Sequence, residues 1–230
     1  MAEVDILMGS FFGILGIAFT LLTLLILRSN RNQINLTFGF STILFGVSSF
    51  ICMLAFYGFQ AEALGFIGNI IMIWAPTAIF FAGKLILDGR DGAYRSPLAI
   101  VVFGAYLLFT IAYALLYFSA SFQLSRSVLV GALIVSVALV LSAYVFGQIY
   151  QVSADSPDVR NKILFLILGL VIGFIGIISA FLSTNDILVP MTFASVSGLV
   201  INIGILLAGL AFTNIPLKIR GSLSGIAVGA

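Results

Sequence analysis

The sequence predicts an all-α integral membrane protein, a single bundle of seven transmembrane helices. Three observations predict this class: the composition, the recurrence of long apolar stretches, and the placement of Lys and Arg. Of the 230 residues, 62% are hydrophobic and 8% are charged, and the mean hydropathy is +1.26. A soluble domain carries about 25% charged residues, so the surface of this protein suits lipid better than water.

Each predicted helix is an apolar run of roughly 20 residues, the length that crosses a hydrocarbon core at about 1.5 Å rise per residue. The first run follows the acidic residues Glu3 and Asp5, whereas a signal peptide begins with basic ones, so it is predicted to be a retained helix. Only short linkers separate the runs, which predicts one transmembrane domain over residues 1–215 and, from Pro216, a short cytoplasmic tail over 216–230. The predicted spans are residues 6–27, 36–59, 66–87, 98–118, 128–150, 163–183 and 188–212.

The Lys and Arg residues predict the orientation. One side of the predicted bundle holds nine of them: Arg28, Arg31, Lys84, Arg90, Arg95, Arg160, Lys162, Lys218 and Arg220. The opposite side holds only Arg126, together with acidic residues. Short cytoplasmic loops are enriched in Lys and Arg, so we expect a multi-pass protein of the cell membrane with its N-terminus outside and its C-terminus in the cytoplasm. The sequon that begins at Asn35 then lies at the cytoplasmic face and is not glycosylated.

The residue types that are missing exclude several chemistries. The chain has no histidine and one cysteine, which excludes histidine-ligated haem, most copper and zinc sites, and histidine-dependent nucleophiles. No acidic residue lies inside a predicted span, which weighs against proton pumps and most cation-coupled transporters. The last span has no lysine for a retinal Schiff base. We therefore expect no enzyme activity, no metal, no cofactor and no nucleic-acid partner.

A ligand site between the helices is predicted from polar and aromatic residues within the spans. The third span contains Pro76, which frees a backbone carbonyl and kinks a helix, often beside a cavity. One face of this span carries Asn69, Ile73, Pro76, Phe80 and Lys84 at helical spacing. The alternative is ordinary packing, in which such residues bond from helix to helix. The candidate ligand-binding residues are Asn69, Trp74, Pro76, Tyr106, Tyr113 and Asn202.

The positions of the two tyrosines in this set lead to further predictions. Tyr113, near the outer end of the fourth span, is expected in the aromatic belt at the membrane surface. Tyr106 lies deeper and needs a partner for its hydroxyl.

Three basic residues near the end of the third span are candidates for lipid or partner contact: Lys84, Arg90 and Arg95. Lys84 lies about one turn from the cytoplasmic end, where a long side chain reaches the interface. It is expected to be a positive interfacial anchor, and the alternative is contact with an anionic lipid head group or with a partner.

Small residues give the sixth and the seventh predicted spans one smooth face each. Gly169, Gly173 and Gly176 share one face of the sixth span, and Gly204 and Ala208 share one face of the seventh. Small residues let helix backbones approach closely. Packing within the bundle is favoured over dimerisation, because seven helices have many internal interfaces.

The order of these features resembles the seven-helix sensor region at the front of some membrane-bound histidine kinases. The similarity lies in the basic first loop (Arg28, Arg31), the proline-bearing third helix over 65–87 with its Asp88-Gly89-Arg90 end, and a sixth helix entered by Arg160-Asn161-Lys162. It covers residues 6–215, and no kinase domain follows. The resemblance implies a ligand-sensing bundle that signals through a separate partner, or a relative that has lost signalling. It carries over no site residues.

Three functions remain open from the sequence. The first is a sensor or receptor-like bundle that binds a small apolar or amphipathic molecule. The second is a non-catalytic accessory subunit of a larger membrane complex. The third, ranked lower, is a transporter of a neutral or lipidic solute. The expected partners are the lipid bilayer and either another membrane protein or a second copy of this chain.

Overall fold

The computed structural model describes residues 3–29, 32–58, 61–117, 124–153, 157–184 and 192–213. Within these ranges the chain forms helices and no strand, which confirms the all-α prediction. The helices are α1 (Glu3–Ser29), α2 (Gln33–Phe56), α3 (Ala61–Arg95), α4 (Pro97–Tyr117), α5 (Leu124–Val152), α6 (Pro157–Thr184) and α7 (Thr192–Leu210).

Six candidate membrane spans occur among the described residues. Each is long and apolar enough to cross a membrane, and they lie on α1 to α6: Gly9–Ser29, Gln33–Ala55, Phe66–Arg95, Pro97–Leu115, Val135–Val152 and Pro157–Gly176. The described helices therefore form a bundle suited to a membrane. The last predicted span, 188–212, begins outside the described residues, as does the predicted tail.

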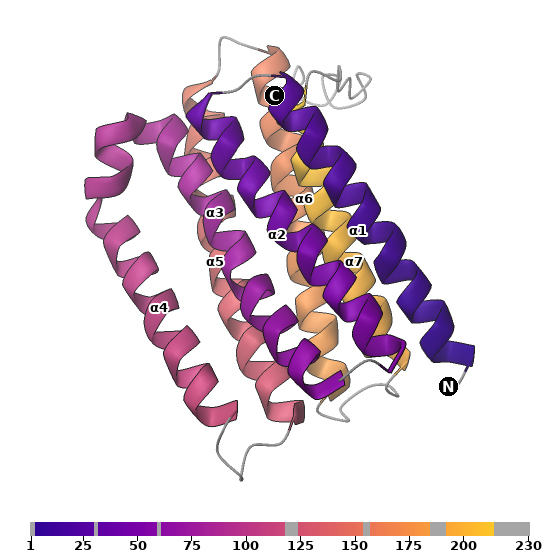
Figure 1. The fold of residues 1–230 in the computed structure, drawn as a ribbon. Coiled ribbons are helices and arrows are strands. Elements are labelled where there is room, and N and C mark those ends of the chain that lie inside the picture. The colour runs from indigo at the N-terminus through magenta and orange to yellow at the C-terminus, as the bar shows by residue number, and fades with distance from the viewer. Residues whose placement is uncertain are drawn as a thin grey trace, which may run out of the picture.

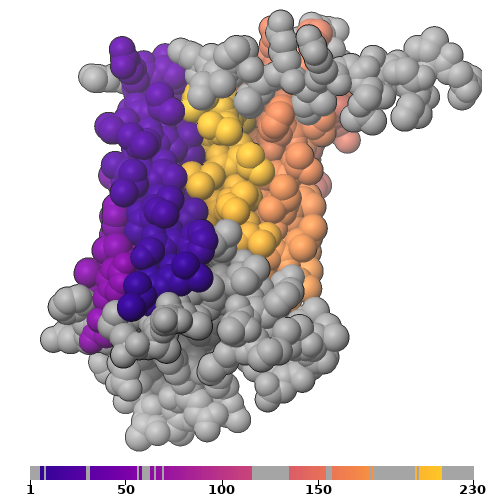
Figure 2. Space-filling view, turned by 90° about the vertical axis from the view of Figure 1, so that its right-hand side faces the viewer, coloured from indigo at the N-terminus to yellow at the C-terminus, as the bar shows by residue number. Residues whose placement is uncertain are grey.

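The helices stand side by side, and α4 is at the edge (Figure 1). Helix α3 is central, because it packs against α2, α4 and α5. Helices α6 and α7 form a second tight pair, which contacts the rest of the bundle through α5, α1 and α2. Figure 2 shows α7 between α1 and α6 on one face of the molecule. Helix α4 contacts only α3 and α5 among the described helices.

Helices α1, α3, α5 and α6 extend beyond the predicted spans at both ends, because their end turns are too polar for the hydropathy pattern to detect. Helices α2 and α7 instead end at Phe56 and Leu210, before the predicted residues 59 and 212. Helix α2 begins at Gln33, where the side chain of Asn32 accepts a hydrogen bond from the backbone N–H of Asn35 and caps the helix. The largest correction concerns α3, since the predicted linker 88–97 is helical up to Arg95. Acidic residues that were placed in linkers, such as Asp88, therefore belong to helices.

Helix α3 changes direction at Gly89. Gly89 has φ 69° and ψ −177°, the one non-helical conformation inside the helix. A backbone with these angles is accessible essentially only to glycine. The six residues that follow it, Arg90 to Arg95, form a short helical segment that connects to α4 at one end of the bundle (Figure 1). We call this segment the end segment.

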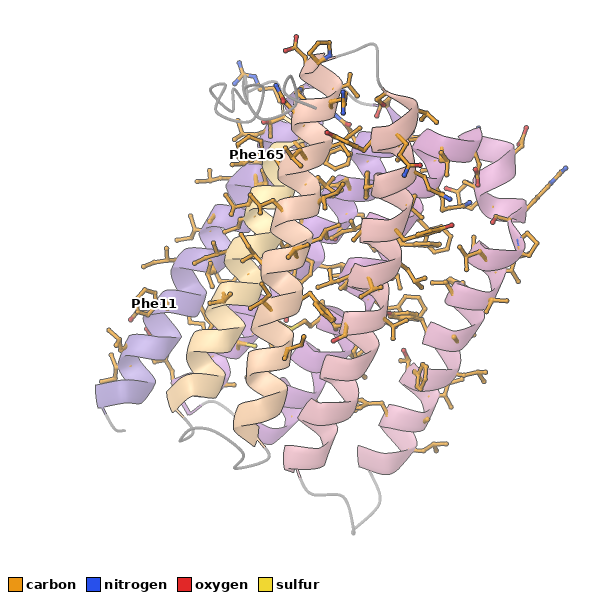
Figure 3. All side chains as sticks on the ribbon, turned by 180° about the vertical axis from the view of Figure 1, so that it is seen from behind. Phe11 and Phe165 are labelled. Carbon is orange, nitrogen blue, oxygen red and sulfur yellow. The ribbon has the colours of Figure 1, made fainter. Side chains whose placement is uncertain are left out.

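The bundle is apolar both inside and outside. Phe19, Phe45 and Phe80 are fully buried, whereas Phe11 on α1 is 40% exposed and points outward (Figure 3). A helix that is hydrophobic all round is typical of a membrane span. Polar groups inside the bundle bond across helices, as the packing alternative expects: Ser41 donates to the carbonyl oxygen of Ala75 at 2.6 Å, and Ser48 donates to that of Gly68 at 3.1 Å.

The small-residue faces pack inside the bundle, as predicted, and the structure shows that the faces of α6 and α7 meet each other. A Cβ atom added to Gly204 would lie 2.5 Å from both the carbonyl oxygen of Gly169 and the backbone nitrogen of Gly173. A Cβ added to Gly169 would likewise meet the backbone of Gly204 and Ala208. The two glycine faces therefore pack against each other inside one chain.

Basic residues gather at the end of the bundle where α1 ends and α2 begins. Six of the seven Lys and Arg residues within the described ranges lie there: Arg28, Lys84, Arg90, Arg95, Arg160 and Lys162. Lys162 donates to the carbonyl oxygen of Thr213 at 2.9 Å, and Ser29 donates to that of Phe212 at 3.1 Å. A cation at these carbonyls is favourable because the C-terminal end of a helix carries partial negative charge.

Candidate ligand site

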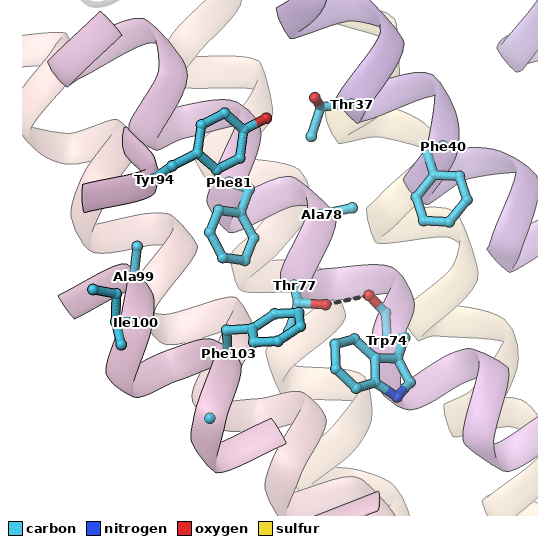
Figure 4. Close-up of a pocket in the computed structure, with 11 residues that line it drawn as sticks. Thr37, Phe40, Trp74, Thr77, Ala78, Phe81, Tyr94, Ala99, Ile100 and Phe103 are labelled. Carbon is cyan, nitrogen blue, oxygen red and sulfur yellow. Dashed lines mark hydrogen bonds between the residues drawn. The ribbon is translucent and has the colours of Figure 1, made fainter. Parts of the chain in front are cut away.

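A groove of about 530 Å³ lies between α2, α3 and α4 (Figure 4). Helix α3 forms its floor with Trp74, Thr77, Ala78 and Phe81. These positions follow the spacing i, i+3, i+4 and i+7, which places them on one face of a helix. This face neighbours the predicted face of Ile73, Pro76, Phe80 and Lys84, whose members are all buried in the core.

The two flanking helices supply the walls. Thr37 and Phe40 come from α2, and Ala99, Ile100, Phe103 and Gly104 come from α4. Phe40, Ile100 and Phe103 are 57%, 60% and 49% exposed, so the groove opens sideways on the outer surface of the bundle. A molecule would enter it from the side.

The groove presents carbon to its contents. Its two threonines use their hydroxyls locally: Thr37 donates to the carbonyl oxygen of Gln33 at 2.8 Å, and Thr77 donates to that of Trp74 (Figure 4). Hydroxyls that already donate within their own helix offer little to a polar ligand. An apolar occupant therefore fits this lining better than a polar one.

Aromatic rings surround one end of the groove. The Trp74 ring packs edge-on against Phe103 at 5.6 Å and against Tyr106 at 6.2 Å between ring centroids. Tyr106 is 2% exposed, and its hydroxyl bonds to the backbone of Ala138 on α5. This hydrogen bond confirms the expected hydroxyl partner and ties α4 to α5 behind Trp74.

The end segment closes the other end of the groove. Tyr94 stacks on Phe81 with centroids 6.5 Å apart and an interplanar angle of 24°. Its hydroxyl accepts a hydrogen bond from the side-chain nitrogen of Gln33 on α2 at 3.2 Å. Because Gly89 turns the chain just before this segment, Tyr94 reaches back over the groove.

Lys84 forms an ion pair with Asp88 one turn along α3. Lys84 is 8% exposed, so its side chain is buried rather than extended into solvent as an interfacial anchor. Sequence reasoning missed Asp88 because that residue was assigned to a linker. The signal was present, since opposite charges four residues apart on a helix attract each other. Arg90 and Arg95 lie on the end segment and are exposed.

Of the six predicted ligand residues, the structure places some at the groove and others away from it. Trp74 lines the groove, Tyr106 lies behind it, and Pro76 is buried on the adjacent face of α3. Tyr113 is 1% exposed and stacks on Phe66 with centroids 5.6 Å apart, so its assignment to a lipid-facing belt was wrong.

The two asparagines are not part of the described groove. Asn202 is buried on α7, a helix without contact to α3 or α4 in the described part of the chain. Asn69 belongs to α3, and its side chain lies outside the described residues. Their roles in ligand binding stay predictions.

The fold and the groove together define the class of protein: an apolar helical bundle that is suited to a membrane and has a groove that opens sideways. Comparison with family models, curated proteins and solved structures gave no match for this chain.

Proposed function

We propose that this protein is a sensor or receptor-like bundle of the cell membrane that binds a small apolar or amphipathic molecule and acts through a separate partner. The observation that carries the proposal is the groove between α2, α3 and α4. Its volume of about 530 Å³ falls in the range of roughly 300–1,000 Å³ that is typical of ligand pockets. Its apolar lining and side opening suit a molecule dissolved in the bilayer.

The proposed orientation is N-terminus outside and C-terminus in the cytoplasm, with seven spans. Its support is the cluster of Lys and Arg where α1 ends and α6 begins, against Arg126 alone at the opposite end of the described bundle. Cytoplasmic loops carry this excess of positive charge. The end segment then lies at the cytoplasmic surface.

The end segment offers a route from ligand to partner. Tyr94 touches the groove and contacts both α2 and α3, through Gln33 and Phe81. The same segment exposes Arg90, Asp91 and Arg95. A molecule that displaces Tyr94 would move charged groups on the surface, and a charged partner would detect this change.

Fluorescence of Trp74 tests ligand binding directly, because it is the only tryptophan of the chain and lines the groove. Titration of the protein in nanodiscs with a brominated alkane should quench this fluorescence along a saturable curve. Gly104→Leu should remove the saturable part, because Gly104 lines the groove and a Cβ there meets open space.

Gly147→Leu is the matched control. Gly147 is also a helical glycine with nothing within 4 Å of an added Cβ, but it lies on α5 away from the groove. The proposal predicts that this variant binds as the unmodified protein does. Linear, non-saturating quenching in all three proteins would overturn the proposed function.

An accessory subunit is the second candidate, and α4 favours it. Only 22% of the apolar span of α4 is buried in the bundle, the lowest share among the six candidate spans. A partner helix would cover this face. Purification in a mild detergent supports this candidate if another membrane protein stays bound in stoichiometric amount and is lost when Leu108 and Leu115, both 69% exposed, are changed to bulky Trp.

A further inference from the structure

We propose that the groove holds the chain of a single-chain anionic lipid, with the methyl end at Trp74 and the head group at the end segment. This inference rests on the proposed function, since it names the class of ligand and the way in which it lies. Four features carry it: the size of the groove, its lining, the difference between its two ends, and the charges beside one of them.

The size of the groove suits one acyl chain. A methylene group is close in volume to a water molecule, whose share of the liquid is about 30 Å³. A groove of about 530 Å³ therefore has room for one long acyl chain.

The lining of the groove favours the hydrocarbon part of a ligand along the whole floor. Between Trp74 and Phe81 the α3 residues that face the groove are Thr77 and Ala78, and the Thr77 hydroxyl already donates to the carbonyl oxygen of Trp74. A polar group of the ligand placed here would lose its hydration without gaining a hydrogen-bond donor from the protein. Burying an unpaired polar group is unfavourable, so the head group lies at an end of the groove.

The two ends differ in polarity. At one end the rings of Trp74 and Phe103 meet, with the buried Tyr106 behind them. At the other end Tyr94 and Gln33 bring a hydroxyl and an amide together at the surface of the bundle. Figure 4 shows Trp74 and Tyr94 at opposite ends of the groove. The polar head therefore belongs beside Tyr94.

The charges beside Tyr94 select an anionic head. Arg90 and Arg95 share the end segment with one acidic residue, Asp91, and all three are exposed. Lys84 adds no net charge, because Asp88 is its ion-pair partner. The end segment therefore carries a net charge of +1. Basic residues at the membrane surface attract anionic lipid heads.

Stearic acid brominated at different carbons tests the proposal. Bromine near the methyl end should quench Trp74 at least three-fold more than bromine near the carboxylate, at equal bound amounts. The Gly104→Leu variant, measured in the same nanodiscs, gives the background from the bilayer. The stearic acid should also bind at least ten-fold more tightly than the brominated alcohol of the same length.

Charge variants locate the head group. The double variant Arg90→Gln, Arg95→Gln should lose most of the preference for acid over alcohol, whereas Arg126→Gln, at the opposite end of the bundle, should keep it. Circular dichroism and gel filtration check that each variant is folded, and the bromine profile of the unmodified protein tests the pose without any substitution.

Each of the other outcomes contradicts the lipid assignment. Equal binding of acid and alcohol overturns this inference and leaves the proposed function standing, as does stronger quenching by bromine near the carboxylate. If no brominated chain, the alkane included, quenches Trp74 along a saturable curve, both this inference and the proposed function are overturned. Should Trp74 be unquenched while the protein is dimeric in nanodiscs, a helix of a second copy fills the groove and the lipid assignment is wrong.

Discussion

The side-chain nitrogen of Gln33 lies 3.2 Å from the hydroxyl oxygen of Tyr94 and donates a hydrogen bond to it. The two residues are 61 positions apart, and their contact fastens the end segment to the start of α2. Tyr94 also stacks on Phe81. One tyrosine thus joins the groove, two long helices and a charged surface segment, which makes it the centre of the proposed signalling route.

Gly89 should be intolerant of any side chain. Its φ of 69° and ψ of −177° lie in a region that costs an L-residue on the order of 1–3 kcal/mol. Gly89→Ala should therefore lower the free energy of unfolding by this amount. Gly104→Ala, in a regular part of α4 with open space at the Cβ, should be neutral or stabilising by up to about 1 kcal/mol. Unfolding in mixed micelles measures both, and an equal effect of the two substitutions would contradict the strained turn.

Gly204→Ala should push α6 and α7 apart, because the new Cβ would lie 2.5 Å from backbone atoms of Gly169 and Gly173. Backbone cannot move aside as a flexible side chain can, and over-packing costs about 1–3 kcal/mol. Thermal unfolding in detergent gives the comparison with Gly147→Ala, for which no clash is expected. If Gly204→Ala is as stable as the control, the two helices do not approach as closely as described.

Asp88→Asn should destabilise the protein, because it leaves the buried Lys84 ammonium without its carboxylate. Breaking a fully buried ion pair costs about 3–5 kcal/mol. The Asp88 side chain is 28% exposed, so a smaller loss is expected here. The double variant Lys84→Met, Asp88→Leu should recover most of the stability, since it removes both charges. A double-mutant cycle measures the coupling, and a coupling near zero would contradict a structural role for the pair.

Asn35 should carry no glycan, for two independent reasons. The proposed topology places it in the cytoplasm, and its side-chain nitrogen is committed to the carbonyl oxygen of Ile26 and to the Ser29 hydroxyl at 3.3 and 3.2 Å. A sequon introduced between α4 and α5, at residues 119–123, should be glycosylated instead, because this part of the chain is proposed to lie outside. A mobility shift that glycosidase reverses reports the result. Modification of Asn35 with no modification of the introduced sequon would reverse the orientation.

The membrane class of this protein could be predicted because it depends on composition along the chain. A helix in lipid satisfies its own peptide groups, so an apolar run of sufficient length marks its position whatever its neighbours are. The smooth faces of α6 and α7 were predictable for a similar reason, since the small residues of each face lie four apart on one helix, but only the structure shows that the two faces meet. The end turns were missed because their polar residues, such as Asn32 and Asp88, end an apolar run before they end a helix.

The surroundings of Trp74 could not be predicted from the sequence. The spacing of Trp74, Thr77, Ala78 and Phe81 reveals a helix face, but it does not reveal whether that face meets a helix, lipid or a cavity. The answer depends on Phe40 and Phe103, which come from α2 and α4 and lie far from Trp74 in the chain. Asn202 was grouped with Trp74 on polarity alone, and the structure places it on a helix that does not reach the groove.

The sequence by itself determined that the chain is helical, that its helices suit lipid, and that its basic residues gather at one end, because these are local properties of each segment. Only the tertiary structure decided that α2 and α4 stand on either side of one face of α3, that Tyr94 reaches back to Gln33, and that Tyr113 is buried. In lipid, apolar faces gain little from choosing one another over the solvent around them. The pairing of helices, and with it the groove, is therefore set by close packing and a few hydrogen bonds that hydropathy does not record.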